Sequence, residues 1–305
     1  MSDFRELGES LRNWGRWGPE DQKGTVNHIT PERLVAAAKL VRTGQIFDLG
    51  IPLDSDGPQP PGAMRINPVH LMRVTGQGQD NPGGFHWADD YIFMPLQAGS
   101  QWDALSHVYY DDLLYNGYPA TEVNDLGAFR NSIDQLAKGI AGRGVLLDIA
   151  RLRGVDWLEN GHVIGPDELD EAAATQGVEV LPGDILLIRT GWRRKFVQER
   201  DPHAFFYPGE PGIGIATCAW LHAKEVAAVG SDNWAVEVVP VEGSDSLPVH
   251  LVLIRDMGMT LGEILDFEEL SESCASDGVW EFFFAGPPLK FTRAVGSPIN
   301  PLAIK

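Results

Sequence analysis

Apolar residues along this chain gather in short continuous runs that alternate with segments of helical pattern. Residues 144–150, GVLLDIA, and residues 181–192, LPGDILLIRTGW, are apolar runs bounded by glycine or proline, which is typical of buried strands. Residues 165–178, GPDELDEAAATQGV, carry acidic residues in the opening turn and Gly177 near the end, which predicts a helix. Strands that alternate with helices in this way predict an α/β fold with a mixed sheet.

The most clearly marked helix lies near the N-terminus, at residues 29–44, ITPERLVAAAKLVRTG. Thr30 stands at the N-cap, Pro31 at the first helical position and Glu32 in the first turn. Gly44 stands where a helix would end. These start and stop signals predict a helix over the whole segment.

The pattern changes after this helix. Residues 45–53, QIFDLGIPL, and residues 69–76, VHLMRVTG, have the patterns of strands. Residues 55–68 between them are rich in glycine and proline and predict a functional or covering loop. Near the C-terminus, residues 282–304 predict a final hairpin region.

Residues 1–28 are interpreted as an N-terminal arm. Trp14 and Trp17 lie in this segment and would be costly to leave in water, so we expect the arm to pack on the body or on another subunit. No fixed repeat and no linker of distinct composition divides the rest of the chain. We therefore interpret residues 1–305 as a single domain that includes this arm.

Composition narrows the possible partners and compartments. The chain of 305 residues has a formal net charge of −19, which disfavours nucleic acid and anionic membranes as partners because both would repel it. Hydrophobic residues make up 43% of the chain, which is ample for a core, yet no run approaches the length of a membrane span. The charged N-terminus does not resemble a signal peptide, so we expect a cytoplasmic protein.

The two cysteines, Cys218 and Cys274, form no CxxC pair, and this disfavours both a disulfide framework and a thiolate zinc site. The chain also has no G-x-S-x-G elbow, no complete dinucleotide fingerprint and no phosphate-binding P-loop. A serine hydrolase of the α/β type and a cofactor-dependent redox enzyme are therefore disfavoured. Any metal must be held by oxygen atoms and imidazole.

Residues 93–110, FMPLQAGSQWDALSHVYY, carry the candidate chemistry. Gln97, Gln101, Asp103 and His107 are all odd-numbered, so in an extended segment they would point to the same side. Small residues separate the two glutamines, where a bulge or a close backbone approach is plausible. Taken alone, the four side chains fit either a buried hydrogen-bond network or a metal site.

The segment resembles the signature of the cyclase family of metal-dependent hydrolases, which includes bacterial kynurenine formamidase and isatin hydrolase. The family pattern H-x-G-T-H-x-D-x-x-x-H corresponds here to Q-A-G-S-Q-W-D-A-L-S-H. Gly99, Asp103 and His107 match, whereas Gln97 and Gln101 replace the first two histidines. This glutamine form resembles the branch of zinc-dependent trans-dienelactone hydrolases.

The resemblance implies a fold, a metal site and an assembly. The fold is the swivelling β/β/α fold, a mixed curved sheet with helices outside. The metal ligands implied are His250 and Glu263 together with Gln97 and Gln101, holding one divalent ion, with Zn²⁺ favoured and Mn²⁺ as its rival. The resemblance also implies a homodimer or homotetramer that acts on a small molecule.

The implied reaction is the opening of a lactone or related cyclic ester, such as a dienelactone that bears a carboxylate, by a metal-activated water. An arylformamidase-like amidase and a non-catalytic binder on the same scaffold are the alternatives. His107 is expected to move protons, and Asp103 is expected to be either a further ligand or a residue that orients the catalytic groups. The residues expected to contact substrate are His86, Trp102, Asp232, Trp234 and Arg65.

Overall fold

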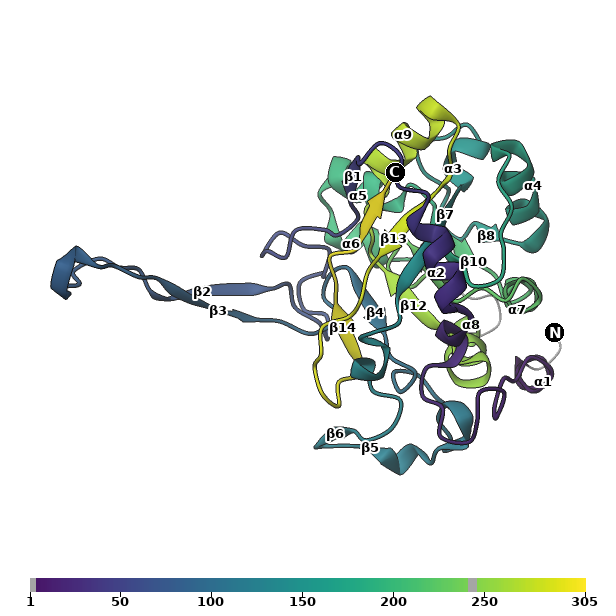
Figure 1. The fold of residues 1–305 in the computed structure, drawn as a ribbon, viewed down its shortest axis with the longest axis horizontal. Coiled ribbons are helices and arrows are strands. Elements are labelled where there is room, and N and C mark those ends of the chain that lie inside the picture. Colours follow the sequence, from purple (N-terminus) through teal and green to yellow (C-terminus); the bar gives the residue numbers. More distant parts are fainter. Residues whose placement is uncertain (1–3, 241–245) are drawn as a thin grey trace.

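A nine-stranded mixed sheet runs through the molecule, as the computed structural model of residues 4–240 and 246–305 shows (Figure 1). The four strands at its centre, β7, β9, β11 and β12, are parallel to one another, and the flanking strands are antiparallel. Across the sheet the order is β1 (Ile46–Asp48), β15 (Leu302–Ile304), β13 (Glu281–Ala285), β7 (Ala141–Asp148), β9 (Ile185–Arg189), β11 (Ala228–Ser231), β12 (Thr260–Glu263), β4 (Gln101–Asp103) and β14 (Gly296–Pro298).

Helices lie outside this sheet (Figure 1). They are α1 (Phe4–Ser10), α2 (Pro31–Ala38), α3 (Ile149–Leu152), α4 (Pro166–Gln176), α5 (Trp192–Glu199), α6 (Pro202–Phe206), α7 (Thr217–Ala223), α8 (Pro248–His250), the π-helix η6 (Leu251–Met257) and α9 (Glu268–Asp277). Short 3₁₀ turns occur at η1 (Gly24–His28), η2 (Pro82–Gly84), η3 (Tyr115–Gly117), η4 (Ala120–Glu122) and η5 (Ile133–Leu136). The mixed α/β fold predicted from the sequence is confirmed. Within the described ranges, no helix has the length and apolar character needed to cross a membrane.

The sheet is buried on both faces. Along β7, Val145 and Leu147 belong to one apolar cluster, and Leu146 between them belongs to the cluster on the opposite face. Neighbouring side chains of a strand point to opposite faces, so a continuous apolar run fills two cores. This explains why the sequence of the parallel strands shows no alternation.

Helix α2 begins as predicted but ends earlier. The Thr30 side chain accepts a hydrogen bond from the Arg33 backbone nitrogen, which confirms the N-cap. The helix ends at Ala38, whereas the sequence predicted a helix to residue 44. The backbone nitrogens of Thr43 and Gly44 instead donate to the carbonyl of Lys305, so the tertiary fold takes this segment away from the helix.

The described part of the N-terminal segment packs on the body. The indole nitrogen of Trp14 donates to the carbonyl of Arg255 at 2.8 Å, and the Trp14 ring packs against the larger core cluster. Asn13 donates to the carbonyl of Met257, also in η6. The arm was expected to pack either on the body or on another subunit, and in the structure it packs on the body of the same chain.

The predicted C-terminal hairpin is confirmed for its two outer strands, which pair antiparallel, but not for the segment between them. β13 pairs with β15 on one side of the sheet, but β14, which lies between them in the sequence, pairs with β4 at the opposite edge. Residues 296–298 therefore cross the molecule to complete the edge beside Gln101 and Asp103. Sequence patterns within one strand do not report which partner it takes.

The small strands pair outside the main sheet. β2 (Val69–Val74) and β3 (Asp89–Phe93) form a long hairpin that projects far from the body (Figure 1). The two other small pairs are β5 (Val123–Asn124) with β6 (Gly127–Ala128), and β8 (Val163–Ile164) with β10 (Gly212–Ile213). The strand predicted at residues 69–76 is thus confirmed as the first arm of the projecting hairpin.

Candidate metal centre

The antiparallel pairing of β4 with β12 brings the candidate chemistry together. Gln101 stands opposite Glu263, and Trp102 stands opposite Gly262. A Cβ at Gly262 would lie 2.5 Å from the Trp102 ring, so only glycine leaves room for this close approach of the two strands. Side chains alternate along a strand, so Asp103, two residues after Gln101 on β4, points to the same side as Gln101.

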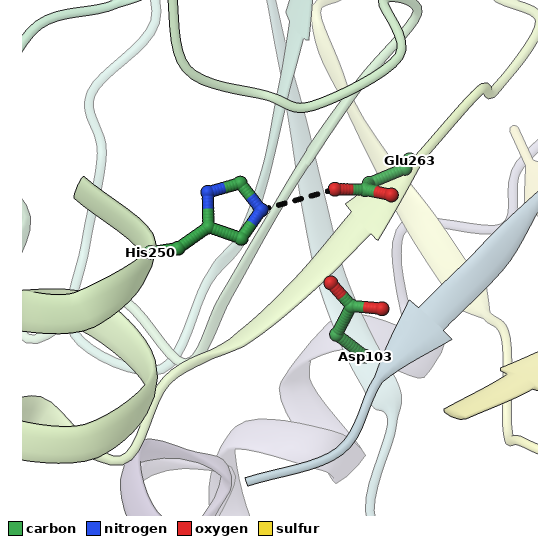
Figure 2. A group of neighbouring side chains, drawn as sticks. All are labelled: Asp103, His250 and Glu263. Atoms are coloured by element: carbon green, nitrogen blue, oxygen red, sulfur yellow. Dashed lines mark hydrogen bonds and ion pairs between the residues drawn. The ribbon is translucent and has the colours of Figure 1, made fainter. Parts of the chain in front are cut away.

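His250 completes the group from the end of α8. One donor atom from each of Asp103, His250 and Glu263 lies within 4.8 Å of the others, and all three side chains are buried (Figure 2). The Nε2 atom of His250 lies 3.2 Å from Oε1 of Glu263. Residues separated by some 160 positions in the sequence thus share one site.

The prediction that four side chains project from one extended strand is wrong for two of them. β4 covers only Gln101–Asp103. Gln97 precedes it in a turn, where the Ala98 nitrogen donates to the carbonyl of Pro95. His107 follows in a second turn, in which its own nitrogen donates to the carbonyl of Ala104. Alternation with period two therefore applies only to Gln101 and Asp103.

A fully buried carboxylate, Glu237, holds His250 in place. Its Oε1 accepts a hydrogen bond from the His250 backbone nitrogen at 2.9 Å and also contacts Nδ1 of the ring. Its Oε2 accepts from the Val249 nitrogen at 3.1 Å. With Nδ1 committed to Glu237, the other ring nitrogen, Nε2, is the one that faces Glu263.

Electrostatics at the site favour a cation. Burial, reinforced by the negative charge of Glu263, raises the pKa of Asp103 well above its ordinary value. Burial alone would lower the pKa of His250, but its hydrogen bonds to Glu237 and Glu263 raise that pKa to about 10. The carboxyl groups thus draw positive charge into the site.

Buried oxygen atoms without hydrogen-bond partners show whether a metal fits the site. Both carboxylate oxygens of Asp103 are buried and have no hydrogen-bond partner, and the same holds for Oε1 of Gln101. Buried acceptors without a donor are costly, and a cation satisfies them as well as a donor does. One imidazole nitrogen with carboxylate and amide oxygens is a donor set suited to zinc or manganese. The residues present therefore fit a divalent ion.

His107 lies beside this group. Its Nε2 is 3.8 Å from Oδ1 of Asp103, and a fifth of its side chain is exposed. Burial, together with the positive charges of Arg65 and His250, lowers the pKa of His107 to about 4 despite the opposing influence of Glu263. The imidazole is therefore uncharged at neutral pH, as a group that serves as proton acceptor must be.

Gln97 lies close by but is oriented differently from Gln101. Its Nε2 is buried without a partner and lies against Gly296, where an added Cβ would approach it to 2.5 Å. Gly296 pairs with Asp103 across β14 and β4. The structure therefore places Gln97 next to the group, with its amide nitrogen packed against β14.

Two of the predicted substrate contacts gather at the edge of the site. The Arg65 guanidinium lies over the Trp234 ring at 4.7 Å and donates to the carbonyl of Gln97 at 3.3 Å. The Trp234 ring also packs against Phe206, with ring centroids 4.3 Å apart, and its indole nitrogen is buried without a partner. A cation, an aromatic face and an unused donor thus lie together.

Of three further predicted substrate contacts, one is wrong and two are engaged in hydrogen bonds elsewhere in the structure. Trp102 is fully buried and donates to the carbonyl of Gly286, since it points to the core side of β4. His86 lies in the exposed outer loop of the β2–β3 hairpin, away from the group, where its Nδ1 lies 3.2 Å from the carbonyl oxygen of Gly76.

Asp232 is the third. It accepts hydrogen bonds from the Thr190 backbone and hydroxyl and from the Gly191 nitrogen, at 2.6–2.8 Å. Both of its oxygens are thereby committed to the turn after β9, and its role is to join that turn to β11. Burial nevertheless raises the pKa of Asp232 to about 6, against the opposing charge of Arg189.

Glu237 is the functional candidate that sequence reasoning missed. It stands in an apolar run, AVEVV, where a lone acidic residue is rarely buried unless it is paired. That signal indicates a buried partner but does not identify it. Only the fold brings Glu237 to His250, which lies 13 positions later.

Comparisons with known proteins identify the family of this chain. A family model described as a putative cyclase matches residues 47–238. A crystal structure described as a novel cyclase is 45% identical, with a TM-score of 0.90, and the match covers 97% of this chain and 100% of that one. The search of curated proteins found no match.

More distant structures share the fold. Isatin hydrolase A from Ralstonia solanacearum is 19% identical over 90% of this chain and 98% of its own, with a TM-score of 0.65. A protein described as a predicted metal-dependent hydrolase from Bacillus stearothermophilus is 17% identical over 86% and 98%, with a TM-score of 0.56. With the family model covering most of the chain and a relative at 45% identity along nearly all of it, this chain belongs to the putative cyclase family.

Proposed function

We propose that this protein is a metal-dependent hydrolase that opens a lactone or a related cyclic ester. The observation that carries the proposal is the buried group of Asp103, His250 and Glu263, in which the Asp103 oxygens have no hydrogen-bond partner. Two distant structures, one described as an isatin hydrolase and one as a predicted metal-dependent hydrolase, support the same reaction class. The resemblance of the motif to hydrolase families supports it as well.

Asp103, His250 and Glu263 would hold one divalent ion, with Oε1 of Gln101 as an additional oxygen ligand. Zn²⁺ is favoured because the set includes an imidazole nitrogen, and Mn²⁺ is its rival because the other donors are oxygens. A bound ion of this kind supplies Lewis acidity and lowers the pKa of a water molecule. This assignment moves Asp103 into the ligand set and Gln97 out of it.

His107 would move the proton. Its ring is neutral at neutral pH, lies beside Asp103 and is partly exposed. It can take a proton from the attacking water and return it to the leaving oxygen of the opened ring. Asp103, in contact with His107, would also help to orient that ring.

Arg65 and Trp234 would select the substrate. A guanidinium held over an indole face suits a flat, unsaturated ring that bears a carboxylate, because the cation can pair with the carboxylate and the aromatic group can pack against the ring. A dienelactone-like substrate has both features, and the glutamine motif resembles the branch that acts on such compounds. The acid should therefore be turned over with a lower KM than its methyl ester.

An arylformamidase-like or cyclic amidase is the second candidate, because an amide carbonyl would meet the same groups and distant structures of this fold are isatin hydrolases. A non-catalytic binder on this scaffold is the third.

The test begins with metal analysis of protein purified without chelator. A panel of lactone carboxylates, their methyl esters, isatin and N-formylkynurenine is then assayed after chelation and after addition of Zn²⁺ or Mn²⁺. We expect about one ion per chain and turnover of a lactone carboxylate restored by metal. Faster turnover of the amides would favour the amidase, and bound metal without turnover of any compound would favour the binder.

A further inference from the structure

Gln97 carries a buried hydrogen-bond donor that no acceptor satisfies. Its Nε2 atom is buried and has no hydrogen-bond partner among the described residues. Such donors are rare in folded proteins, because burial removes the amide from water without replacing the hydrogen bond that water supplied. A donor of this kind at the edge of a candidate site therefore indicates that the acceptor arrives with the ligand.

This amide lies on the same face of the sheet edge as the Asp103 carboxylate. Gly296 on β14 stands directly opposite Asp103 on β4, and residues opposite each other in an antiparallel pair point to the same face. A Cβ added to Gly296 would extend toward this face and would meet Nε2 of Gln97 at 2.5 Å. The missing side chain of Gly296 thus leaves the space that the Gln97 amide occupies, beside the carboxylate proposed to hold the metal.

Tertiary hydrogen bonds fix the backbone that carries Gln97. Arg65 donates to the carbonyl of Gln97 at 3.3 Å, and the Gln59 side chain donates to the carbonyl of Ala98 at 3.0 Å. The Ser100 hydroxyl accepts from a backbone nitrogen at 2.9 Å and donates to a carbonyl at 2.6 Å, both in segments distant in the sequence. A donor on a backbone fixed in this way is held in position before a substrate arrives.

Gln97 and Gln101 offer opposite ends of their amides. The nitrogen of Gln101 donates to Glu263, so its Oε1 is the end without a partner, and an oxygen suits a cation. The end of Gln97 without a partner is the nitrogen. An N–H group carries partial positive charge, so it suits an oxygen atom that gains negative charge during a reaction.

We propose that Gln97 is a catalytic residue whose Nε2 donates a hydrogen bond to the carbonyl oxygen of the substrate. This inference rests on the proposed function, the opening of a lactone or related cyclic ester. Water adds to the carbonyl carbon and gives one proton to His107, and the electron pair of the carbonyl double bond moves onto its oxygen. The pair then returns, the bond from the carbonyl carbon to the ring oxygen breaks, and the ring oxygen takes the proton from His107.

The hydrogen bond from Gln97 would be strongest while the negative charge is on the carbonyl oxygen. An interaction that strengthens in the transition state raises kcat, whereas one that is equal in the ground state changes only KM. Removal of one donor of this kind typically lowers kcat by about 10²- to 10³-fold. Loss of the Gln97 donor should therefore lower kcat and leave KM nearly unchanged.

The test compares wild type with Gln97→Met, whose side chain has a similar length but no donor. Both are assayed with a dienelactone carboxylate and with its thiono analogue, in which sulfur replaces the carbonyl oxygen. Sulfur accepts hydrogen bonds weakly, so the variant should slow the oxygen compound by about 10²- to 10³-fold and the thiono compound far less. Metal content, measured by elemental analysis of the same samples, should stay at the wild-type level.

Gly296→Ala provides a second variant, since its methyl group would displace the Gln97 amide and should give the same pattern. The matched control is Gly165→Ala, where an added Cβ meets no atom within 4 Å, and it should keep wild-type kinetics. Equal slowing of both compounds by Gln97→Met, or loss of metal from it, would overturn the catalytic role. Undiminished turnover in Gln97→Met would refute that role alone, whereas a wild type that opens neither compound would refute the proposed function as well.

Discussion

Glu263 on β12 stands directly opposite Gln101 on β4, and the Gln101 amide nitrogen donates a hydrogen bond to the Glu263 carboxylate. This bond commits the nitrogen end of the amide and leaves Oε1 as the end without a partner. The pairing of the two strands therefore presents an amide oxygen and a carboxylate to the same space. His250 borders that space from α8, and Asp103 borders it from β4, the strand that also carries Gln101.

Removal of a proposed ligand should empty the site. His250→Ala and Glu263→Ala each delete one of three clustered donors, so we expect the metal content of the purified protein to fall from about one ion per chain to near zero. Elemental analysis of dialysed samples measures this. His203→Ala, a change at an exposed histidine of α6, should retain the metal. Full metal occupancy in both ligand variants would contradict the proposed centre.

His107→Ala should separate catalysis from metal binding. The residue is proposed to transfer protons and not to hold the ion, so metal content should stay at the wild-type level. Loss of a general acid–base group lowers turnover by about 10²- to 10⁴-fold. Steady-state kinetics and metal analysis on the same sample check both expectations. Metal loss in this variant would show that His107 is a ligand.

Glu237→Gln should weaken metal binding without removing any proposed ligand. Glu237 fixes the His250 ring through Nδ1 and through the backbone, and loss of such an orienting partner typically costs about 10- to 100-fold in metal affinity. Competition with a chromogenic chelator measures the change. The matched control is Glu210→Gln, another fully buried carboxylate, which accepts hydrogen bonds from the backbone nitrogens of Trp234 and Ala235 and has no bond to His250.

The two variants should differ in metal affinity even if both lower the melting temperature, because only Glu237 contacts the ligand. Equal losses of affinity would indicate that Glu237 acts through general stability alone. Glu237→Ala should weaken affinity further, since it also removes the acceptor for the Val249 nitrogen.

Asp184 should make folding stability depend on pH. Burial raises the pKa of Asp184 to about 6 from an ordinary 3.8, even though Arg143 pairs with it at 2.5 Å. Because the folded pKa exceeds the unfolded one, the folded state binds the proton more tightly between these values. The contribution of this group to the free energy of unfolding should therefore fall as pH rises from about 4 to about 6.

Urea unfolding of wild type and Asp184→Asn at pH 4, 5, 6 and 7 measures this effect. The difference between the two proteins should change by on the order of 2 kcal/mol between pH 4 and pH 6 and then level off. A difference that stays constant with pH would show that Asp184 remains charged in the folded protein.

The candidate site shows which kinds of prediction a sequence permits. The motif from Gln97 to His107 identified the right segment, and the resemblance that pointed to His250 and Glu263 named residues that do lie beside Asp103. The strand pattern failed for Gln97 and His107 because β4 is only three residues long and turns flank it. Trp102 was wrongly predicted to contact substrate. Its neighbours Gln101 and Asp103 point to the site, so the alternation of side chains along β4 directs Trp102 into the core.

The sequence by itself determined the local elements of this protein: the Thr30 cap of α2, the apolar runs of β7 and β9, and the acidic opening of α4. Local propensity and periodicity act between residues a few positions apart, so they can be read from the chain. Only the tertiary structure decided that β14 crosses to β4, that Glu237 reaches His250 and that the β2–β3 hairpin projects from the body (Figure 1). These relationships depend on which distant segments share a register, and packing across the whole sheet selects that register.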